Sequence, residues 1–252
     1  MKKTFVLLSL FVIALAPAAQ TRYFYEWKNG VPTQRLITEV DSITFELIEE
    51  PRDSINTDTI VYNTVDLGLP SGTLWADRNV GAEYPEAFGE YYAWGETSPS
   101  DFYEWSTYKW CEGKNNTMTK YCTNSSYGTV DNKTVLDLED DAAYVNMGAE
   151  WRMPTYDEQE ELRNNCTWTW TTQSGTEGYR VTGPNGKSIF LPAAGFRHDS
   201  YLSYAGSNGD YWSASLDEGY PYAAWRLYFN SSSCYTSVYY RYSGHTVRAV
   251  AR

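Results

Sequence analysis

The chain has 252 residues and carries a formal net charge of −12 at neutral pH. An acidic chain repels the phosphates of nucleic acids and of anionic lipids, so this charge argues against both as partners. Aromatic residues make up 17% of the sequence, which indicates an ordered core and argues against a disordered chain. The length allows one large domain with a small appendage, or two small domains.

The first 19 residues predict a signal peptide. Lys2 and Lys3 supply the positive start, residues 5–16 form the apolar stretch, and residues 16–18 offer small side chains for cleavage. The apolar stretch is too short to cross a bilayer, and no later stretch reaches the ~18 apolar residues that a span needs. We therefore expect an exported protein that is periplasmic, extracellular or held at the cell surface, without membrane insertion.

A small β-hairpin unit is expected over residues 20–48. Residues 23–28 are rich in aromatic side chains, which favour strands, and the Asn-Gly pair at 29–30 is a strong signal for a two-residue hairpin turn. Residues 36–37 and 42–45 predict further short strands. Two or three such strands are only marginally stable by themselves.

Residues 49–60 predict a linker, because they are polar and charged and include one proline. The main domain is therefore expected to occupy residues 61–252. At its start, residues 64–75 predict two strands separated by a Pro-Ser-Gly turn.

Two helices are expected in the middle of the main domain. The first spans residues 138–147, and its first turn holds three acidic residues, 139–141, which interact favourably with the helix dipole. The second spans residues 156–164, because Thr155 and Glu158 have the spacing of a capping box.

Only strand and turn signals follow the second helix. Residues 168–170 predict one strand, and residues 178–182 and 188–191 predict a hairpin joined by Gly-Pro-Asn-Gly-Lys. Residues 235–242 and 245–250 predict the last two strands. Two helices and many short antiparallel strands, preceded by a small β unit, predict an α+β fold.

Residues 223–229 alternate between two faces of a further strand. One face is apolar and should lie in the core: Ala223, Trp225, Leu227 and Phe229. The opposite face carries Ala224, Arg226 and Tyr228. Trp225 and Phe229 are therefore expected to be structural residues.

The segment from Asp199 to Ser243 has the composition of a recognition surface. It holds ten of the chain's 23 tyrosines and ten serines, and it contains no lysine. Tyrosine offers a large amphipathic contact area at low entropic cost, and serine offers adaptable hydrogen bonds. The alternative is a β-rich domain that uses tyrosine because tyrosine favours strands.

Six motifs in the main domain carry a resemblance to a known family: Val65-Asp-Leu-Gly-Leu-Pro-Ser-Gly-Thr-Leu-Trp75, Tyr92-Ala-Trp-Gly-Glu96, Trp151-Arg-Met-Pro-Thr155, Phe190-Leu-Pro-Ala-Ala-Gly195, Tyr211-Trp-Ser213 and Gly244-His-Thr-Val-Arg248. Over residues 61–252 the chain resembles the Fibrobacter succinogenes major paralogous domain family, whose members are mostly secreted or surface proteins of bacteria. The resemblance implies a C-type-lectin-like domain of the formylglycine-generating-enzyme type. The variable proteins of diversity-generating retroelements share that fold, and their ligand sites lie on the C-terminal part.

Composition and resemblance together place a ligand-binding surface on the C-terminal part of the chain. The predicted contact residues are Asp199, Tyr201, Tyr204, Tyr220, Tyr222, Tyr235, Ser237, Tyr239 and Tyr240. Tyr211 and Trp212 belong to one of the motifs, so we assign both to the core. The expected function is a binding module for adhesion or recognition, and its partner is a glycan or a surface protein.

No catalytic residue, metal ligand or cofactor is predicted. The tripeptide at 183–185 is faintly similar to the calcium-binding tripeptide of C-type lectins, but a Pro-Asn-Gly turn explains it better. The acidic residues at 139–141 could also gather around calcium, although acidic side chains are common in a first helical turn.

An enzyme on the same fold is the alternative function. Enzymes of the formylglycine-generating type use a cysteine pair near the C-terminus, where this chain has only Cys234. The two histidines are His198 and His245, and the sequence motifs of zinc proteases, serine hydrolases and phosphate-binding loops are missing. A carbohydrate-active enzyme remains open, because two distant carboxylates leave no motif in a sequence.

Two cysteines, Cys111 and Cys122, flank a hairpin-like stretch. Export permits a disulfide between them, and two free buried thiols are the alternative. Cys166 lies beside Trp168 and Trp170 in the sequence and is expected to be a buried thiol.

Overall fold

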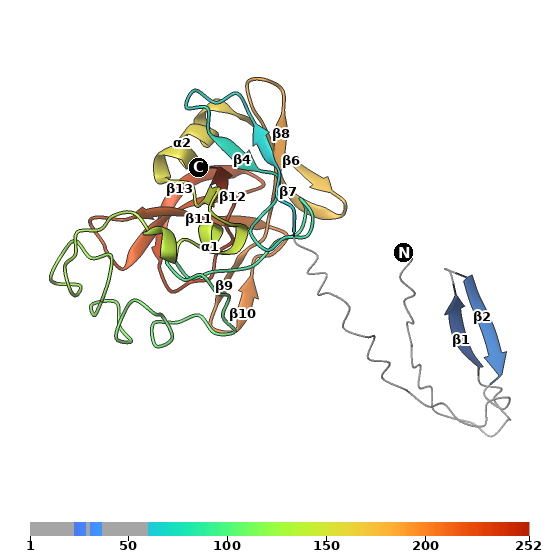
Figure 1. Cartoon of the computed structure of the whole chain (residues 1–252), viewed down its shortest axis with the longest axis horizontal. Coiled ribbons are helices and arrows are strands. Elements are labelled where there is room, and N and C mark those ends of the chain that lie inside the picture. The colour runs from blue at the N-terminus through green and yellow to red at the C-terminus, as the bar shows by residue number, and fades with distance from the viewer. Residues whose placement is uncertain (1–22, 29–30, 37–59, 252) are drawn as a thin grey trace. The chain divides into compact units, whose positions relative to one another are not determined.

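Figure 1 shows the computed structural model of the chain, which describes residues 23–28, 31–36 and 60–251. The chain divides into two compact units, Met1–Thr57 and Asp58–Arg252. The division falls within the segment that the sequence predicts as a linker. Three predictions lie outside the described residues: the signal peptide, the strand at 42–45 and the linker apart from its last residue.

The described residues of the first unit form a β-hairpin. Strand β1 (Tyr23–Lys28) pairs antiparallel with β2 (Val31–Leu36), and Lys28 lies opposite Val31. This register leaves a two-residue connection, which agrees with the turn that the Asn-Gly pair predicts. The second strand begins earlier than expected, because a two-residue turn fixes its first residue at Val31 rather than near position 36.

The second unit is α+β and mainly β, with every pairing between its named strands antiparallel. Its strands are β3 (Thr64–Asp66), β4 (Leu74–Ala76), β5 (Trp151–Arg152), β6 (Thr167–Gln173), β7 (Thr176–Thr182), β8 (Ser188–Pro192), β9 (Phe196–His198), β10 (Tyr201–Ser203), β11 (Asn208–Leu216), β12 (Ala223–Asn230), β13 (Ser233–Tyr240) and β14 (Val250–Ala251). Its helices are the 3₁₀ turn η2 (Leu138–Asp140), α1 (Ala142–Met147) and α2 (Tyr156–Asn165).

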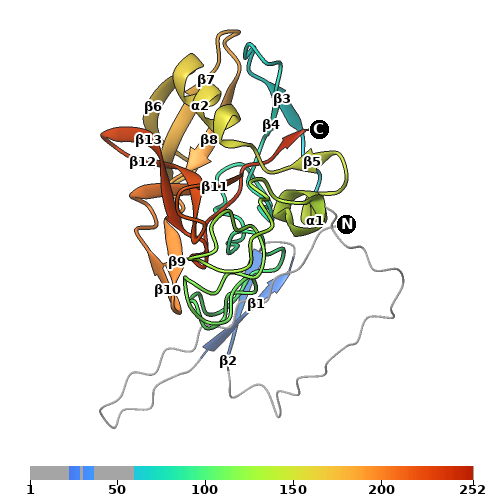
Figure 2. The same ribbon diagram turned by 90° about the vertical axis from the view of Figure 1, so that its left-hand side faces the viewer.

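The strands form three sheets and a separate hairpin. The sheet orders are β3-β4-β14-β5, β6-β7-β8 and β11-β12-β13, and β9 pairs with β10. In both Figure 1 and Figure 2, the sheet of β11, β12 and β13 lies between helix α2 and the β9–β10 hairpin. One face of this sheet therefore lies toward α2, and the other lies toward the hairpin.

Helix α2 begins at the predicted capping box. The Thr155 side chain accepts a hydrogen bond from the backbone N–H of Glu158, and the Glu158 carboxylate accepts one from the backbone N–H of Thr155. Arg152 donates to both carboxylate oxygens of Glu158 over 2.6 Å, so the cap is also tied to β5. Leu162 is fully buried and anchors the helix to the core.

The predicted helix over 138–147 is wrong in its first turn. Asp141 has extended backbone angles and accepts hydrogen bonds from the backbone N–H groups of Ala143 and Tyr144, which makes it the N-cap of α1. Aspartate is a favoured N-cap residue because its short side chain reaches these otherwise unpaired donors. The helix is therefore divided at Asp141 into the short turn η2 and the α-helix α1.

Alternation along β12 divides the strand into the two predicted faces. Leu227 and Phe229 point to the core. The centroid of the Phe229 ring lies 5.6 Å from that of Tyr211 and 5.3 Å from that of Tyr179. The expectation for Trp225 is wrong in degree, because Trp225 is only half-buried and packs on Tyr156 of α2 with 4.4 Å between ring centroids. Tyr156, the first residue of α2, covers only part of the tryptophan ring, so the rest of the ring stays in solvent.

The opposite face of β12 is also covered, because Ala224 and Arg226 are buried. Tyr211 and Trp212 on β11 are 1% and 0% exposed, which confirms their assignment to the core. Because both faces of the sheet are covered, the alternation of apolar and polar residues does not by itself show which face is the functional one.

The closing segment is buried but is mostly not a strand. Residues 243–250 are all buried, yet only β14 at Val250–Ala251 joins the sheet, where the sequence predicts a strand over 245–250. Single bridges of His245 with Tyr92 and of Thr246 with Tyr211 hold the segment in the core. Strand β13 also ends at Tyr240, two residues before its predicted end. In the described part of the chain, no helix has the length and apolarity that a membrane span needs.

Candidate functional site

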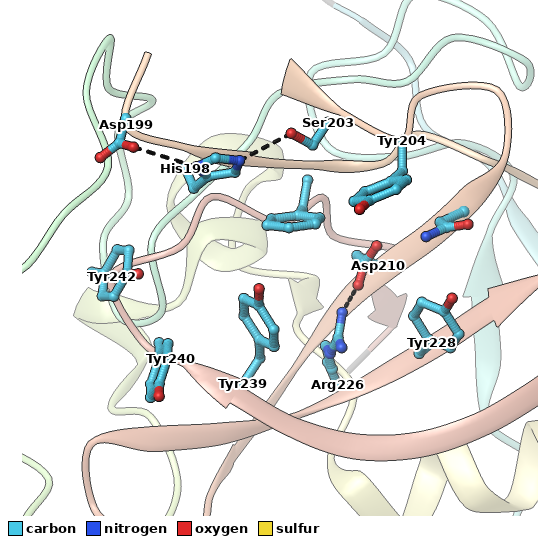
Figure 3. Close-up of a pocket in the computed structure, with 12 residues that line it drawn as sticks. His198, Asp199, Ser203, Tyr204, Asp210, Arg226, Tyr228, Tyr239, Tyr240 and Tyr242 are labelled. Atoms are coloured by element: carbon cyan, nitrogen blue, oxygen red, sulfur yellow. Dashed lines mark hydrogen bonds and ion pairs between the residues drawn. The ribbon is translucent and has the colours of Figure 1, made fainter. Parts of the chain in front are cut away.

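A hollow of about 730 Å³ lies between the β9–β10 hairpin and the sheet of β11, β12 and β13 (Figure 3). We call it the first pocket. Its lining residues are Phe196, His198, Asp199, Ser203, Tyr204, Asn208, Asp210, Arg226, Tyr228, Tyr239, Tyr240 and Tyr242. All but Tyr242 come from β9, β10, β11, β12, β13 or the turns directly after β9 and β10, so the pocket belongs to the tyrosine-rich segment and its immediate neighbour.

Strand register places the polar floor of the pocket. Asp210 on β11 lies opposite Tyr228 on β12, and Arg226 on β12 lies opposite Ser237 on β13. Directly opposed residues in an antiparallel pair share one face of the sheet, and every second residue along a strand returns to it. These residues and Tyr239 therefore occupy the face that looks toward the hairpin.

The hairpin supplies the roof. Phe196 pairs with Ser203 and His198 pairs with Tyr201, so these four side chains share one face of the hairpin. Phe196, His198 and Ser203 line the pocket, whereas Tyr201 does not. The backbone N–H and C=O of Asp199 exchange hydrogen bonds with those of Tyr103 at 2.8 and 2.9 Å, which fixes the tip of the hairpin.

Two pocket residues hold backbone conformations that are uncommon for residues other than glycine. Asp199 has φ of 48° and Tyr204 has φ of 58°, both in the left-handed region. Such conformations persist where the surrounding structure determines them, and they gather at binding and active sites. Each residue follows one strand of the hairpin, so both turns at the pocket rim adopt this geometry.

A buried ion pair between Asp210 and Arg226 forms the floor of the pocket (Figure 3). Asp210 is fully buried, and Arg226 is 9% exposed. Apart from this ion pair, no group in the described ranges donates to either carboxylate oxygen, and Nε of Arg226 has no acceptor. Burial lowers the pKa of Arg226 to about 10, so the guanidinium remains charged at neutral pH. Its carbon Cζ lies 4.3 Å from the ring centroid of Tyr239.

Further buried polar groups without partners lie beside this ion pair. The His245 ring is fully buried and stacks on Trp212 with 4.0 Å between centroids, and neither of its nitrogens has a hydrogen-bond partner among the residues described. Burial, aided by the charge of Arg226, holds the pKa of His245 well below 6.5, so the ring is neutral. The hydroxyl of Ser237, opposite Arg226, is also buried and unpaired.

The neutral His245 ring predicts a loss of stability below pH 6.5. The unfolded chain takes up a proton on this ring near pH 6.5, whereas the folded chain does not, so the free energy of unfolding falls with falling pH. Between pH 7.5 and 5.5 this group alone accounts for a loss of about 1.4 kcal/mol. Urea unfolding at both pH values, for the wild type and for His245→Phe, isolates the effect because other titrations cancel. The same pH dependence in both proteins would contradict the prediction.

Four of the nine predicted contact residues line the first pocket: Asp199, Tyr204, Tyr239 and Tyr240. Tyr220 and Tyr222 line a second pocket of about 390 Å³, together with Ala223, Val238, Tyr239 and Tyr240. The remaining three lie beside these pockets. Tyr201 is 65% exposed and contacts the His198 ring, Tyr235 contacts the Tyr228 ring, and Ser237 is half-buried.

Sequence reasoning missed most of the polar floor and the roof. The missed residues are Phe196, His198, Ser203, Asn208, Asp210, Arg226, Tyr228 and Tyr242. For Arg226 and Tyr228 a signal was present, because alternation already placed them on the face opposite the core. The partner of Arg226 could not be found in the same way, because Asp210 meets it only through the register of two strands.

Three roof residues have the order of a nucleophile, a base and an orienting acid. Nε2 of His198 lies 3.0 Å from the hydroxyl oxygen of Ser203, and Nδ1 lies 3.5 Å from a carboxylate oxygen of Asp199. The second distance is longer than a hydrogen bond, and the side chains of His198 and Asp199 are 39% and 50% exposed. The hydrogen bond between His198 and Ser203 joins the two strands of the hairpin, so it has a structural role whether or not the three residues are catalytic.

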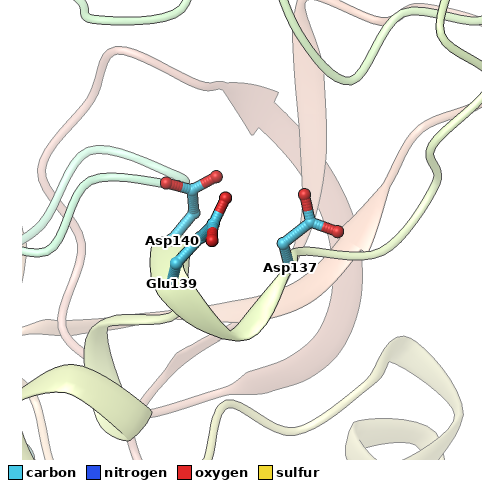
Figure 4. A group of neighbouring side chains, drawn as sticks. All are labelled: Asp137, Glu139 and Asp140. Atoms are coloured by element: carbon cyan, nitrogen blue, oxygen red, sulfur yellow. The ribbon is translucent and has the colours of Figure 1, made fainter.

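An acidic cluster lies away from the pocket (Figure 4). It consists of Asp137, Glu139 and Asp140, whose carboxylate oxygens lie within 4.8 Å of one another. The ammonium of Lys120 lies 2.6 Å from Asp137 and from Asp140, so a lysine already supplies the positive charge. Its hydrogen bond to Asp137 holds the pKa of that carboxyl below the ordinary value. Asp141 is not part of the cluster, because it caps α1.

The weak calcium-like tripeptide is a turn. The Asn185 side chain donates to the backbone carbonyl of Asp66 and accepts from the backbone N–H of Lys187. Gly183 and Lys187 close the hairpin through a backbone hydrogen bond of 2.9 Å. The amide of Asn185 is therefore occupied in joining the β7–β8 hairpin to β3.

All four cysteines are free thiols. Cys111 and Cys122 therefore follow the second of the two alternatives, although only Cys122 is fully buried. Cys166 is half-buried, where a buried thiol was expected. Burial raises the pKa of Cys234 to about 12, so this cysteine is poorly suited to act as a thiolate nucleophile.

In comparisons with known proteins, no family model, no curated protein and no solved structure matches the chain. The resemblance to the major paralogous domain family remains a prediction from the six motifs.

Proposed function

We propose that the chain is an exported binding module that holds its ligand in the first pocket. The observation that carries this proposal is the buried Asp210–Arg226 pair, with unused hydrogen-bonding capacity, beneath walls of tyrosine. The ligand is a glycan or a segment of a surface protein, and binding serves adhesion or recognition. Its fold is the C-type-lectin-like fold of the major paralogous domain family.

Buried polar atoms without partners are costly, so they are uncommon in folded proteins. They are tolerated where a ligand supplies the missing hydrogen bonds. Of the nine such atoms in the described part of the chain that also lack an ion-pair partner, five belong to Asp210, Arg226, Ser237 and His245. Their concentration around one pocket supports a ligand that brings its own donors and acceptors.

The rim of the pocket suits contact with a partner. Tyr204 is 62% exposed and Tyr240 is 46% exposed, although both are large aromatic side chains. Exposed tyrosines over a rigid frame give contact area at low entropic cost. The frame is supplied by residues of the six motifs, because Trp75, Trp94 and Trp212 are buried at 1% exposure or less.

Truncating the rim tyrosines is expected to weaken ligand binding more than it weakens the fold. We expect Tyr204→Ala and Tyr240→Ala each to cost ~2 kcal/mol or more in binding free energy, and about 1 kcal/mol or less in unfolding free energy. A glycan and surface-protein binding screen identifies the ligand, and titration calorimetry with urea unfolding measures both effects.

Tyr84→Ala is the matched control, because Tyr84 is 54% exposed and lines neither pocket. It should leave binding unchanged. The proposal fails if no ligand of either class binds, or if the rim variants bind like the wild type.

The His198–Ser203 contact favours a second candidate function, hydrolysis of an acyl ester in the same pocket. In that case Ser203 is the nucleophile, His198 is the general base and Asp199 orients it. Ser203→Ala would then lower the turnover of p-nitrophenyl acetate by about a thousandfold or more. If the chain is a binding module, the wild type and Ser203→Ala should both hydrolyse this ester no faster than free imidazole at the same concentration.

A further inference from the structure

The first and second pockets share a wall. Tyr239 and Tyr240, at the end of β13, line both pockets, and we call these two residues the ridge. On the far side of this ridge, the second pocket is lined by Tyr220 and Tyr222 from the β11–β12 connection. A ligand that fills the first pocket can therefore continue across the ridge into the second.

Aromatic rings form a continuous path from one pocket to the other. The distances between successive ring centroids are 6.1 Å from Tyr204 to Phe196, 5.3 Å from Phe196 to Tyr239, 5.8 Å from Tyr239 to Tyr240, 6.0 Å from Tyr240 to Tyr222 and 5.7 Å from Tyr222 to Tyr220. These steps are similar in length to one sugar ring of an extended glycan. The two ends are also well exposed, with Tyr204 at 62% and Tyr220 at 53%.

Resting on the proposed binding function, we propose that the ligand is an extended, uncharged glycan of several sugar rings. One end lies over the Asp210–Arg226 floor, and the chain crosses the ridge of Tyr239 and Tyr240 to stack on Tyr220. The first pocket is then one subsite and the second pocket is another.

The lining of the first pocket favours a sugar over a peptide. It contains no aliphatic side chain, whereas the anchor pockets of protein interfaces take up apolar side chains. Its groups are aromatic faces, hydroxyls, an amide, an imidazole and a carboxylate–guanidinium pair. Aromatic faces match the C–H faces of sugar rings, and the planar polar groups match the hydroxyls at their edges.

Electrostatics favours an uncharged glycan over an acidic one. Arg226 could bind a carboxylate or a sulfate, but its charge is already compensated by Asp210. The whole chain has a net charge of −12, which repels a polyanion. A polar ligand without charge exploits the donors and acceptors of the pair and leaves the pair intact.

Titration calorimetry with neutral oligosaccharides of one to six rings tests this proposal. The gluco, xylo, manno and chito series serve as probes. In at least one series, we expect affinity to rise about tenfold or more between two and five rings, as the chain reaches the second pocket. Tyr220→Ala should abolish that increase and leave the affinity for the shortest ligands unchanged. Tyr204→Ala should weaken binding at every length.

Two control variants separate stacking from other effects. Tyr220→Phe retains the ring and should keep most of the increase with length, whereas Tyr84→Ala should change nothing. The proposal is overturned if affinity does not depend on length, if Tyr220→Ala affects all lengths equally, or if no neutral oligosaccharide binds. In the last case, a protein ligand found in the wider screen would still leave the binding function standing, and the absence of any ligand would remove both.

Discussion

Replacing Asp210 by asparagine is expected to lower the free energy of unfolding by about 3–5 kcal/mol, because it leaves the buried Arg226 cation without its counter-charge. Arg226 is 9% exposed and makes its only ion pair within the described ranges with Asp210. Its other close neighbours are the rings of Tyr239 and Tyr228, with centroids 4.3 and 5.1 Å from Cζ, which cannot replace a carboxylate. Urea unfolding at pH 7.5 measures the loss.

The double variant Asp210→Asn with Arg226→Met should recover most of that stability. Removing both charges also removes the cost of burying them, and an apolar side chain of similar length fills the space of Arg226. Lys133→Met serves as a control for an exposed pair, because its ion pair with Asp137 should contribute only about 0.2–1 kcal/mol. The interpretation is wrong if Asp210→Asn costs less than 1 kcal/mol, or if the double variant is no more stable than the single one.

The same double variant separates stability from function. If it folds as stably as the wild type but no longer binds ligand, then the ion pair contributes to recognition and is not needed for folding. A buried pair is by itself weak support for a stabilising role, since well-packed apolar residues often do equally well. We therefore expect the pair to serve ligand binding, because it lies at the floor of an aromatic pocket.

Local sequence signals predicted the elements that depend on few neighbours. Thr155 and Glu158 are three residues apart, and their reciprocal hydrogen bonds form within one helical turn, so the start of α2 could be read directly. The β7–β8 hairpin and the two faces of β12 follow from turn residues and alternation in the same way. Asp141 shows the limit of this approach, because an acidic residue before a helix can be either a cap or a first-turn residue.

The pocket depends on contacts that no local signal encodes. Asp210 and Arg226 meet through the register of β11 and β12, which depends on which strands become neighbours. Most of the roof escaped prediction because the turn between β9 and β10 contains Asp199 and Ser200 and lacks the glycine that usually marks such turns. Composition and the family resemblance pointed to three of the pocket tyrosines, Tyr204, Tyr239 and Tyr240, because neither signal depends on how the strands pair.

Phe229→Ala is expected to destabilise the fold by about 3–5 kcal/mol, as a large deletion in the core. The side chain of Phe229 is fully buried and contacts four aromatic rings, those of Trp168, Trp170, Tyr179 and Tyr211. Gly209 lies against the same ring so closely that an added Cβ would be 2.0 Å from it. On that side the ring faces the backbone of Gly209, which has no side chain that could move into the cavity.

Trp225→Ala should cost roughly half as much, although tryptophan is the larger residue, because its half-buried ring packs chiefly on Tyr156. Urea unfolding of both variants measures the order, and a larger loss for Trp225→Ala would mean that this end of the sheet is a core.

Phe229→Leu should retain enough of the fold for a binding titration. We expect its affinity to stay within about twofold of the wild type, because Phe229 and the pocket lie on opposite faces of one sheet. If the affinity of Phe229→Leu falls as far as that of Tyr204→Ala, then the two faces of the sheet are coupled. In that case the pocket residues do not bind ligand independently of the core packing around Phe229.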